Sequence, residues 1–193
     1  MKLYLYKSSV KALLLVAFLF PAIVFGQTEN STKQNVFRLN VINPGIEYEH
    51  SLSEKSKLSV NAGFGVSMSY PELTSFQPDY AFFLSSFLDL HYKFIYNLDR
   101  RIAMKKNIDY NSGDFVGLKI IGRGVEVGQS NTLKRTDNVD FSVGPTWGIQ
   151  RSFSKIHLLF NAGPVYYFDT KGNSGFYPIM LELNIGYNVW KSK

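Results

Sequence analysis

The strongest constraint on the fold is a strict alternation of apolar with small or polar residues. It is clearest over residues 79–97, where every second residue from Tyr80 to Tyr96 is apolar except Ser86. The opposite parity includes Asp89 and Lys93. Because successive side chains of a β-strand point to opposite faces, this segment has one apolar and one largely polar face. Strands of soluble sandwiches usually span about 5 to 6 residues. A strand this long favours a tilted bilayer crossing over a soluble sandwich.

The same period of two returns in five further segments. They cover residues 57–68, 116–121, 139–150, 156–166 and 177–189. Apolar-out and polar-in alternation in segments separated by turn residues is typical of transmembrane β-barrels. Beyond the N-terminus no apolar run is long enough for a transmembrane helix of roughly 20 residues. A closed barrel is the remaining structure that satisfies its backbone in lipid.

The number of strands depends on residues 35–52. Phe37, Leu39 and Val41 are apolar at odd positions, whereas Ile46 and Tyr48 are apolar at even positions. Two short strands joined at residues 43–45 would explain this change of parity, although a one-residue bulge in a single strand would do so equally well. Six long strands are expected after residue 56, and single-chain outer-membrane barrels have an even number of strands. Two strands within residues 35–52 bring the total to eight. The sequence therefore predicts an all-β fold, an antiparallel up-and-down transmembrane barrel of eight strands.

The N-terminus has the pattern of an export signal. Lys2, Lys7 and Lys11 precede an apolar stretch of about 14 residues, which is short of a membrane span, and Gly26 closes a plausible cleavage site. We expect a signal peptide at 1–26, a flexible periplasmic lead at 27–34 and an outer-membrane barrel domain at 35–193. Without the signal, 18 basic residues stand against 15 acidic ones, which is too balanced to indicate nucleic-acid binding. The chain has no cysteine, which excludes a disulfide framework and a lipidated N-terminal cysteine.

The connections predict which end of the barrel faces outward, because short turns face the periplasm and long loops face outward in such barrels. Short turns are expected at residues 53–56 and 152–154, and long loops at 71–78, 125–138 and 169–175. Residues 98–112 are long for a periplasmic turn. Their Arg100-Arg101 and Lys105-Lys106 pairs indicate either a solvated turn or a contact for an acidic partner.

Three motifs carry a resemblance to a known family. They are Asn43-Pro44-Gly45-Ile46-Glu47-Tyr48-Glu49, Tyr96-Asn97-Leu98-Asp99-Arg100-Arg101 leading to Asn111-Ser112-Gly113, and Val143-Gly144-Pro145 with Gly148-Ile149-Gln150-Arg151. With these motifs the chain resembles small outer-membrane β-barrel domain proteins of Gram-negative bacteria. The resemblance implies an eight-stranded barrel similar to the OmpA-like barrel, and it carries no catalytic chemistry.

The inward parity of the expected strands carries charges of both signs. They are Glu47, Glu49, Asp89, Asp140 and Glu182 against Lys93, Lys119, Arg123 and Arg38, with Asn61, Asn161, Asn184 and Gln150 between them. An eight-stranded barrel has room inside for little more than side chains, and buried charges need partners. We therefore expect a polar, plugged lumen. A narrow ion path and a specific small-ligand site are the alternatives.

No constellation in the sequence indicates catalysis, a cofactor or a metal. His50 has outward parity, His91 and His157 have inward parity, and no histidine pair has zinc-motif spacing. Ser85, Asp89 and His91 share one face, but Asp89 and His91 are about 6.6 Å apart along a strand, too far for a triad.

We therefore expect a non-enzymatic integral protein of the cell outer membrane with a structural or surface-interaction role. A narrow channel or transporter, and a lipid-modifying enzyme, are the alternatives. The expected partners are outer-membrane lipid, lipopolysaccharide near Lys134-Arg135, and the barrel-assembly machinery during insertion. The sequence specifies no protein partner.

Overall fold

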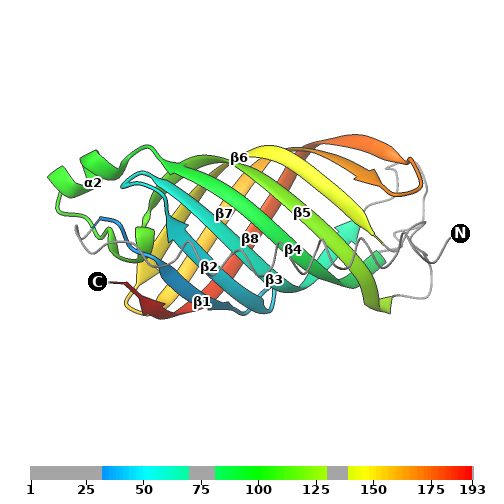
Figure 1. Cartoon of the computed structure of the whole chain (residues 1–193), viewed down its shortest axis with the longest axis horizontal. Helices are drawn as coiled ribbons and strands as arrows, with labels where there is room; N and C mark the ends of the chain where they lie inside the picture. Colours follow the sequence, from blue (N-terminus) through cyan, green and yellow to red (C-terminus); the bar gives the residue numbers. More distant parts are fainter. Residues whose placement is uncertain (1–31, 70–80, 130–138, 193) are drawn as a thin grey trace, which may run out of the picture. The chain divides into compact units, whose positions relative to one another are not determined.

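The alternating segments form eight antiparallel strands that pair in chain order and close into a barrel (Figure 1). The computed structural model describes residues 32–69, 81–129 and 139–192, and all of them belong to one unit. The strands are β1 (Val36–Asn40), β2 (Gly45–Ser51), β3 (Ser56–Ser69), β4 (Ala81–Ile95), β5 (Gly113–Gln129), β6 (Asp140–Phe153), β7 (Ile156–Asp169) and β8 (Ser174–Lys191). The predicted all-β, eight-stranded antiparallel barrel is confirmed.

The first two strands are separate, as the change of parity favoured. Val36 pairs with Glu49 and Asn40 pairs with Gly45, so β1 and β2 form a hairpin around residues 41–44. β1 also pairs with β8 from Val36↔Lys191 to Asn40↔Gly186, which closes the barrel. The bulge alternative for residues 35–52 is therefore wrong, because the chain reverses direction there.

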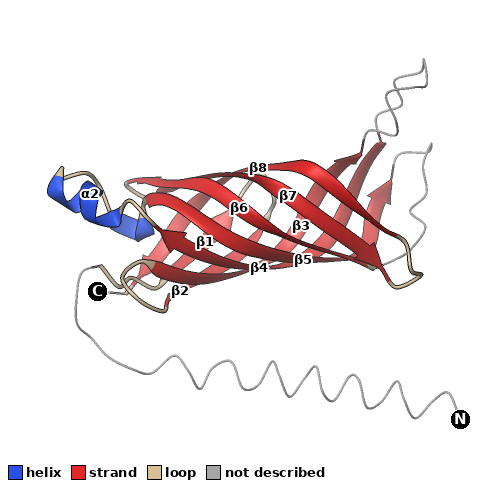
Figure 2. Ribbon diagram, turned by 90° about the horizontal axis from the view of Figure 1, so that it is seen from above, coloured by secondary structure: helices blue, strands red, loops and turns tan. Residues whose placement is uncertain are grey.

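The barrel has two different ends. The cap end holds the β2–β3 and β6–β7 turns, residues 96–112, the start of β1 and the end of β8. The loop end is the opposite end of the longer strands β3 to β8 and holds the β7–β8 turn. The β1–β2 turn lies between the two ends (Figure 1). Figure 2 shows the tilted strands between the ends, with α2 (Leu98–Ala103) beyond the cap end. Residues 96–112, here called the cap, also contain the 3₁₀ turn η2 (Asp109–Asn111).

Some predicted connections have different bounds. β6 runs to Phe153, so the β6–β7 turn is Ser154–Lys155 and not 152–154. The link expected at 169–175 is a tight turn, because Asp169 Oδ1 accepts hydrogen bonds from the backbone N–H groups of Lys171 and Asn173. The loop expected at 125–138 begins as strand, since β5 continues to Gln129. The predicted loop at 71–78 and residues 130–138 lie outside the described residues.

The barrel is apolar outside and polar inside. Large apolar side chains point outward and are exposed, among them Leu88 (58 %) and Leu181 (67 %). Most buried side chains are polar or charged, and Arg38, Glu49, Lys57, Lys93 and Gln150 are almost inaccessible. The small buried apolar cluster of Ile95, Leu98, Phe115 and Leu159 lies near the cap. This distribution is the reverse of that in a soluble globular domain.

β8 departs from the predicted parity near the loop end. Between Gly163 and Val165 of β7 the register shifts, so Val165 pairs with Tyr177 and Tyr166 pairs with Phe176. Directly paired residues share a face, and Val165 is buried inside the barrel. Tyr177 therefore faces inward, whereas the sequence placed it on the outward face with Leu181. An extra residue in β8 explains the reversal.

Among the described residues, no helix has the length and apolar character needed to cross a membrane.

Candidate functional site: the polar lumen

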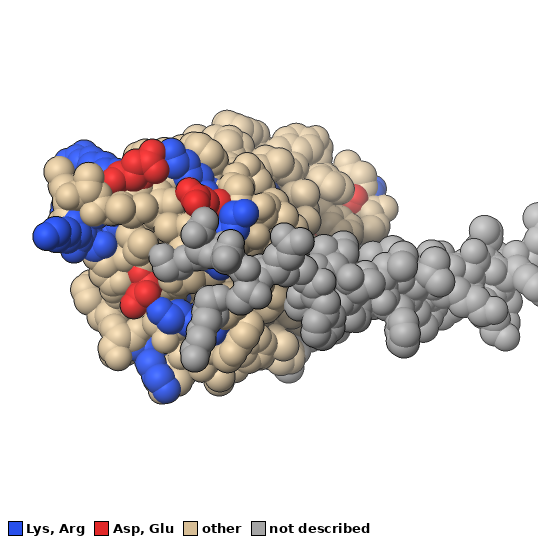
Figure 3. All heavy atoms as spheres, turned by 60° about the vertical axis from the view of Figure 1, so that its left-hand side comes forward, with Lys and Arg blue, Asp and Glu red and all other residues tan. Residues whose placement is uncertain are grey.

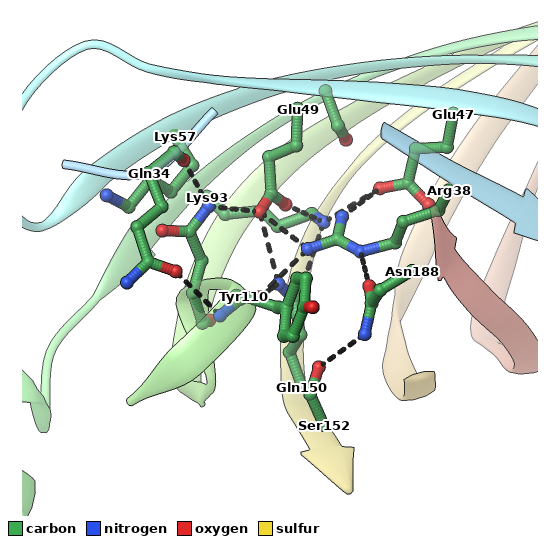
Figure 4. A network of polar contacts seen from close by, with 12 residues as sticks. Gln34, Arg38, Glu47, Glu49, Lys57, Lys93, Tyr110, Gln150, Ser152 and Asn188 are labelled. Atoms are coloured by element: carbon green, nitrogen blue, oxygen red, sulfur yellow. Dashed lines mark hydrogen bonds and ion pairs between the residues drawn. The ribbon is translucent and has the colours of Figure 1, made fainter. Parts of the chain in front are cut away.

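The candidate site is a network of buried polar side chains at the cap end of the lumen (Figure 4). Arg38 on β1 lies directly across the hairpin from Glu47 on β2. Glu47 and Glu49 are two residues apart, so both point into the lumen. Lys93 reaches the same carboxylates from β4. The period of two therefore places two acids and two bases in one layer.

Arg38 is the centre of this layer. Its guanidinium donates to Glu47 Oε1 at 3.1 Å, to Glu49 Oε1 at 3.0 Å and to Asn188 Oδ1 at 3.0 Å. The ammonium of Lys93 lies 2.7 Å from Glu49 Oε2 and 3.5 Å from Glu47 Oε1. All four charged groups are almost completely buried. Their formal charges cancel, which is the condition under which buried ions are tolerated.

Neutral amides complete the coordination of Glu49. Gln150 donates to its Oε1 at 3.2 Å, and Asn111 donates to the same oxygen at 2.7 Å. The side-chain oxygen of Gln150 in turn accepts from Lys93 at 2.9 Å. The Glu49 carboxylate therefore accepts four hydrogen bonds from four residues.

The cap closes the layer with backbone carbonyls. Tyr110 O accepts from Arg38 at 3.0 Å and from Gln150 at 3.2 Å. Tyr110 and Asn111 reach these positions in left-handed backbone conformations, with φ of 53° and 58°. Gln34 also belongs to this closure, because its side-chain oxygen accepts from the Tyr110 N–H at 2.8 Å. Gln34 is buried, although the sequence assigned it to a flexible lead.

The cap is thus more than the solvated turn that the sequence allowed. Arg100, Lys105 and Lys106 are exposed, but Leu98, Asn111 and Ser112 are buried. In Figure 3 the charged side chains gather at this end, while the flank of the barrel in that view is nearly free of them.

Ion pairs tie the cap to the rest of the barrel. Lys55 lies 2.5 Å from Asp99, and Lys191 lies 2.7 Å from Asp109.

Arg101 donates to Asn107 O within the cap at 2.5 Å. Burial, with a smaller contribution from the neighbouring Arg151, lowers the pKa of Arg101 from its ordinary value.

Two further clusters of charged side chains line the lumen between this layer and the loop end. Lys119 pairs with Asp89 at 2.8 Å and also with Glu182, and Asn161 donates to Glu182 at 2.8 Å. Nearer the loop end, Arg123 lies 3.2 Å from Asp140 and both are partly buried. Each charged residue that the sequence placed inside the barrel has an opposite charge within reach.

The histidines do not form a catalytic or metal site in the described part of the chain. His91 Nε2 shares a hydrogen bond with Thr146 Oγ1 at 2.8 Å, and its ring meets Phe115 edge-on. Asp89 pairs with Lys119, so Ser85, Asp89 and His91 are not connected as a triad. His157 is fully buried, and neither ring nitrogen has a hydrogen-bond partner in the described structure. No group of three His, Cys, Asp or Glu residues within the described ranges could hold a metal ion.

Sequence reasoning found the inward charges but missed the cap as part of the site. Tyr110 contributes through its backbone carbonyl, a group that every residue has. Tyrosine is also not a residue type that predicts a left-handed backbone conformation. Asn111 was the available signal, since Asn tolerates that conformation better than most residues. Lys134-Arg135, expected to meet lipopolysaccharide, lies outside the described residues.

No family model, curated protein or solved structure matches the chain.

Proposed function

We propose that this chain is a non-enzymatic integral protein of the bacterial outer membrane, whose closed barrel has a structural or surface-interaction role. One observation carries the proposal: exposed apolar side chains surround the barrel while ion-paired side chains fill it. Such a surface is unfavourable in water and favourable in hydrocarbon. Each strand also pairs with both of its neighbours, so the barrel makes most of its backbone hydrogen bonds internally, as a bilayer demands.

The remaining parts of the proposal come from the sequence. Residues 1–26 would direct export and be removed, and the barrel-assembly machinery would insert residues 35–193. The cap end would then face the periplasm, because short turns lie there. Lipid, including lipopolysaccharide, is the expected surrounding partner.

Closure of the lumen supports a structural role over transport. The Arg38–Glu49–Lys93 layer spans residues of β1, β2 and β4, and Gln150 joins it from β6. The cap lies across the same end. An ion would have to break several charge-assisted hydrogen bonds to pass. We therefore expect the intact barrel not to conduct.

The first test is the migration of the mature protein on a denaturing gel after separation of inner and outer membranes. A barrel stable in lipid should migrate faster unboiled than boiled and should appear in the outer-membrane fraction. A soluble protein without a heat-dependent shift would refute the proposal and restore the sandwich alternative.

A planar-bilayer recording separates the structural role from the channel alternative. The purified barrel should show no discrete conductance. Conductance that changes with Lys93→Gln, but not with the exposed-pair control Lys55→Gln, would establish a channel through the lumen. For the enzyme alternative, expression should leave the lipid A mass spectrum unchanged, and a new lipid A species would refute the non-enzymatic role.

A further inference from the structure

A pocket lies at the cap end of the barrel, where α2, the start of β5 and the end of β6 meet. It encloses about 120 Å³. A single water needs roughly 10 to 15 Å³, so the pocket has room for a group of several heavy atoms. Four bases and one acid line it, namely Arg100, Arg101, Lys106 and Arg151 with Asp114. We call it the cap pocket.

The acid of the cap pocket is already neutralised. Asp114 pairs with Arg151 and accepts a hydrogen bond from Asn97 Nδ2 at 2.6 Å. By contrast, no carboxylate of the described residues lies within ion-pair distance of Arg100, Arg101 or Lys106. The pocket therefore presents three positive charges that no acid in the described part of the chain balances.

Arg101 differs from the other two cations because it is buried. Only 8 % of the residue is exposed. Within the described ranges its guanidinium makes one hydrogen bond, from Nη2 to Asn107 O, and its Nε has no partner. A charge withdrawn from water is costly unless an opposite charge compensates it. The fold thus holds a buried cation, without its counter-charge, in the wall of a pocket.

The chain reversal after α2 brings Lys106 to the same pocket. The N–H of Lys106 donates to Arg101 O at 2.8 Å, and the N–H of Lys105 donates to Ile102 O at 2.9 Å. With Lys105 in a left-handed conformation (φ 53°), these two bonds form a Schellman turn. The turn separates the two neighbouring lysines, because Lys106 lines the pocket and Lys105 does not.

The cap pocket lies where the apolar outer surface of the barrel ends. On β5 the outward residue Val116 is apolar and exposed, and the next outward residue toward the cap end is Asp114. On β6 the outward stripe likewise passes from Trp147 to Arg151. Trp147 Nε1 donates to the hydroxyl of Tyr96 at 3.1 Å. Because Trp and Tyr are enriched at the headgroup level of membranes, a barrel in a bilayer would hold this pocket among the headgroups.

We propose that the cap pocket binds the phosphate of an anionic phospholipid in the leaflet at the cap end. Arg100, Arg101 and Lys106 supply the charge, and guanidinium groups match phosphate oxygens in geometry. The ammonium of a zwitterionic headgroup would be repelled by these cations, so a headgroup with net negative charge is preferred. The position beside Trp147 and Tyr96, on the outer face of the barrel, favours a lipid over an acidic protein. The inference rests on the proposed membrane location and adds a ligand class to it.

Titration of the folded barrel with phospholipid, followed by native mass spectrometry, tests the proposal. The mature barrel in neutral detergent micelles receives dioleoylphosphatidylglycerol or dioleoylphosphatidylcholine, and the fraction with one bound lipid is measured. Arg100→Gln and Lys106→Gln each remove a charge from an exposed side chain of the pocket. Lys105→Gln is the matched control, because it removes the same charge from the same turn but outside the pocket. Heat-dependent gel migration shows whether each variant is folded.

We expect the native barrel to bind phosphatidylglycerol more tightly than phosphatidylcholine. Arg100→Gln and Lys106→Gln should each weaken phosphatidylglycerol binding about fivefold. Lys105→Gln should change it by less than about twofold, because an exposed charge outside the pocket is screened. Equal affinity for the two lipids, or equal effects of Lys106→Gln and Lys105→Gln, would overturn the proposal.

Competition in the same titration identifies the source of the anion. Inorganic phosphate that displaces phosphatidylglycerol at equal concentration would show a site for a free anion. An oligoglutamate peptide that displaces it would assign the pocket to an acidic protein, and either result contradicts a lipid site.

Insertion into pure phosphatidylcholine vesicles separates this inference from the membrane location. A barrel that inserts there with heat-dependent migration, but does not prefer phosphatidylglycerol, refutes the phosphate site alone. A protein that inserts into neither phosphatidylcholine nor phosphatidylglycerol vesicles refutes the membrane location and the phosphate site together.

Discussion

Replacing Glu49 by glutamine should strongly destabilise the barrel, because this carboxylate holds the cap-end layer together. It accepts hydrogen bonds from Arg38, Lys93, Asn111 and Gln150 at 2.7 to 3.2 Å. Glu49→Gln keeps the shape of the side chain but leaves the two buried cations, Arg38 and Lys93, with one carboxylate, that of Glu47. It also places an amide NH₂, itself a donor, against one of the donors that Glu49 now accepts from. Removing one partner of a buried ion pair costs about 3 to 5 kcal/mol of unfolding free energy. We expect a loss in that range.

An exposed pair provides the matched control. Asp99 is 73 % exposed and lies 2.5 Å from Lys55, so Asp99→Asn makes the same acid-to-amide change in solvent. Such pairs contribute about 0 to 1 kcal/mol. Urea titration of the folded protein in micelles, followed by tryptophan fluorescence, gives both free energies. Glu49→Gln destabilising no more than Asp99→Asn would refute the assignment of the layer as a structural ion network.

A double variant tests the cause of the loss. Adding Lys93→Met to Glu49→Gln removes the unpaired cation and replaces it with an apolar chain of similar length. The loss for the double variant should be smaller than the sum of the two single losses, because the residues share one network. If the two losses of unfolding free energy simply add, the two side chains act independently, and the unpaired positive charge is not the cause of the loss in Glu49→Gln.

Two further predictions address the barrel wall. Leu88→Arg, at the centre of β4, should cost about 2 to 4 kcal/mol in lipid, and Phe153→Arg, at the cap end of β6, about 0 to 1; equal losses in vesicle-based urea titrations would contradict the assigned membrane depth. A Cβ atom added at Gly163 would lie 2.0 Å from Pro145 O, whereas one at Gly122 would lie 3.3 Å from the nearest atom, a ring carbon of Phe141. Gly163→Ala should therefore cost about 1 to 3 kcal/mol and Gly122→Ala less, measured by the same titration, and the reverse order would exclude close strand contact at Gly163.

The period of two in the sequence predicted most of the fold, because every strand with one apolar and one polar face shows that period. It placed Lys93, Lys119 and Glu182 inside the barrel and separated β1 from β2 by their parity. It could not decide which charges pair, since the partners of Lys119 lie on β4 and β8 and depend on how the strands are staggered around the ring. A residue pattern along one strand does not contain that stagger.

The two main misses have local causes. Phe176 and Tyr177 are both aromatic, so either could continue the outward stripe of β8, and only the register with β7 decides between them. The cap has no regular period, and Tyr110 acts through its backbone. Both features depend on contacts with distant segments and not on residue type.

The seam between β1 and β8 also has a consequence for the kinetics of folding. Arg38 and Asn188 form a hydrogen bond across 150 residues of chain, and only five register pairs close the ring there. Contacts between distant residues form late, since a long loop must be ordered before they contribute. We therefore expect β1 to β8 to assemble first as neighbouring hairpins, and the seam between β1 and β8 to form last. The same short seam should be the first part of the barrel to exchange its amide hydrogens.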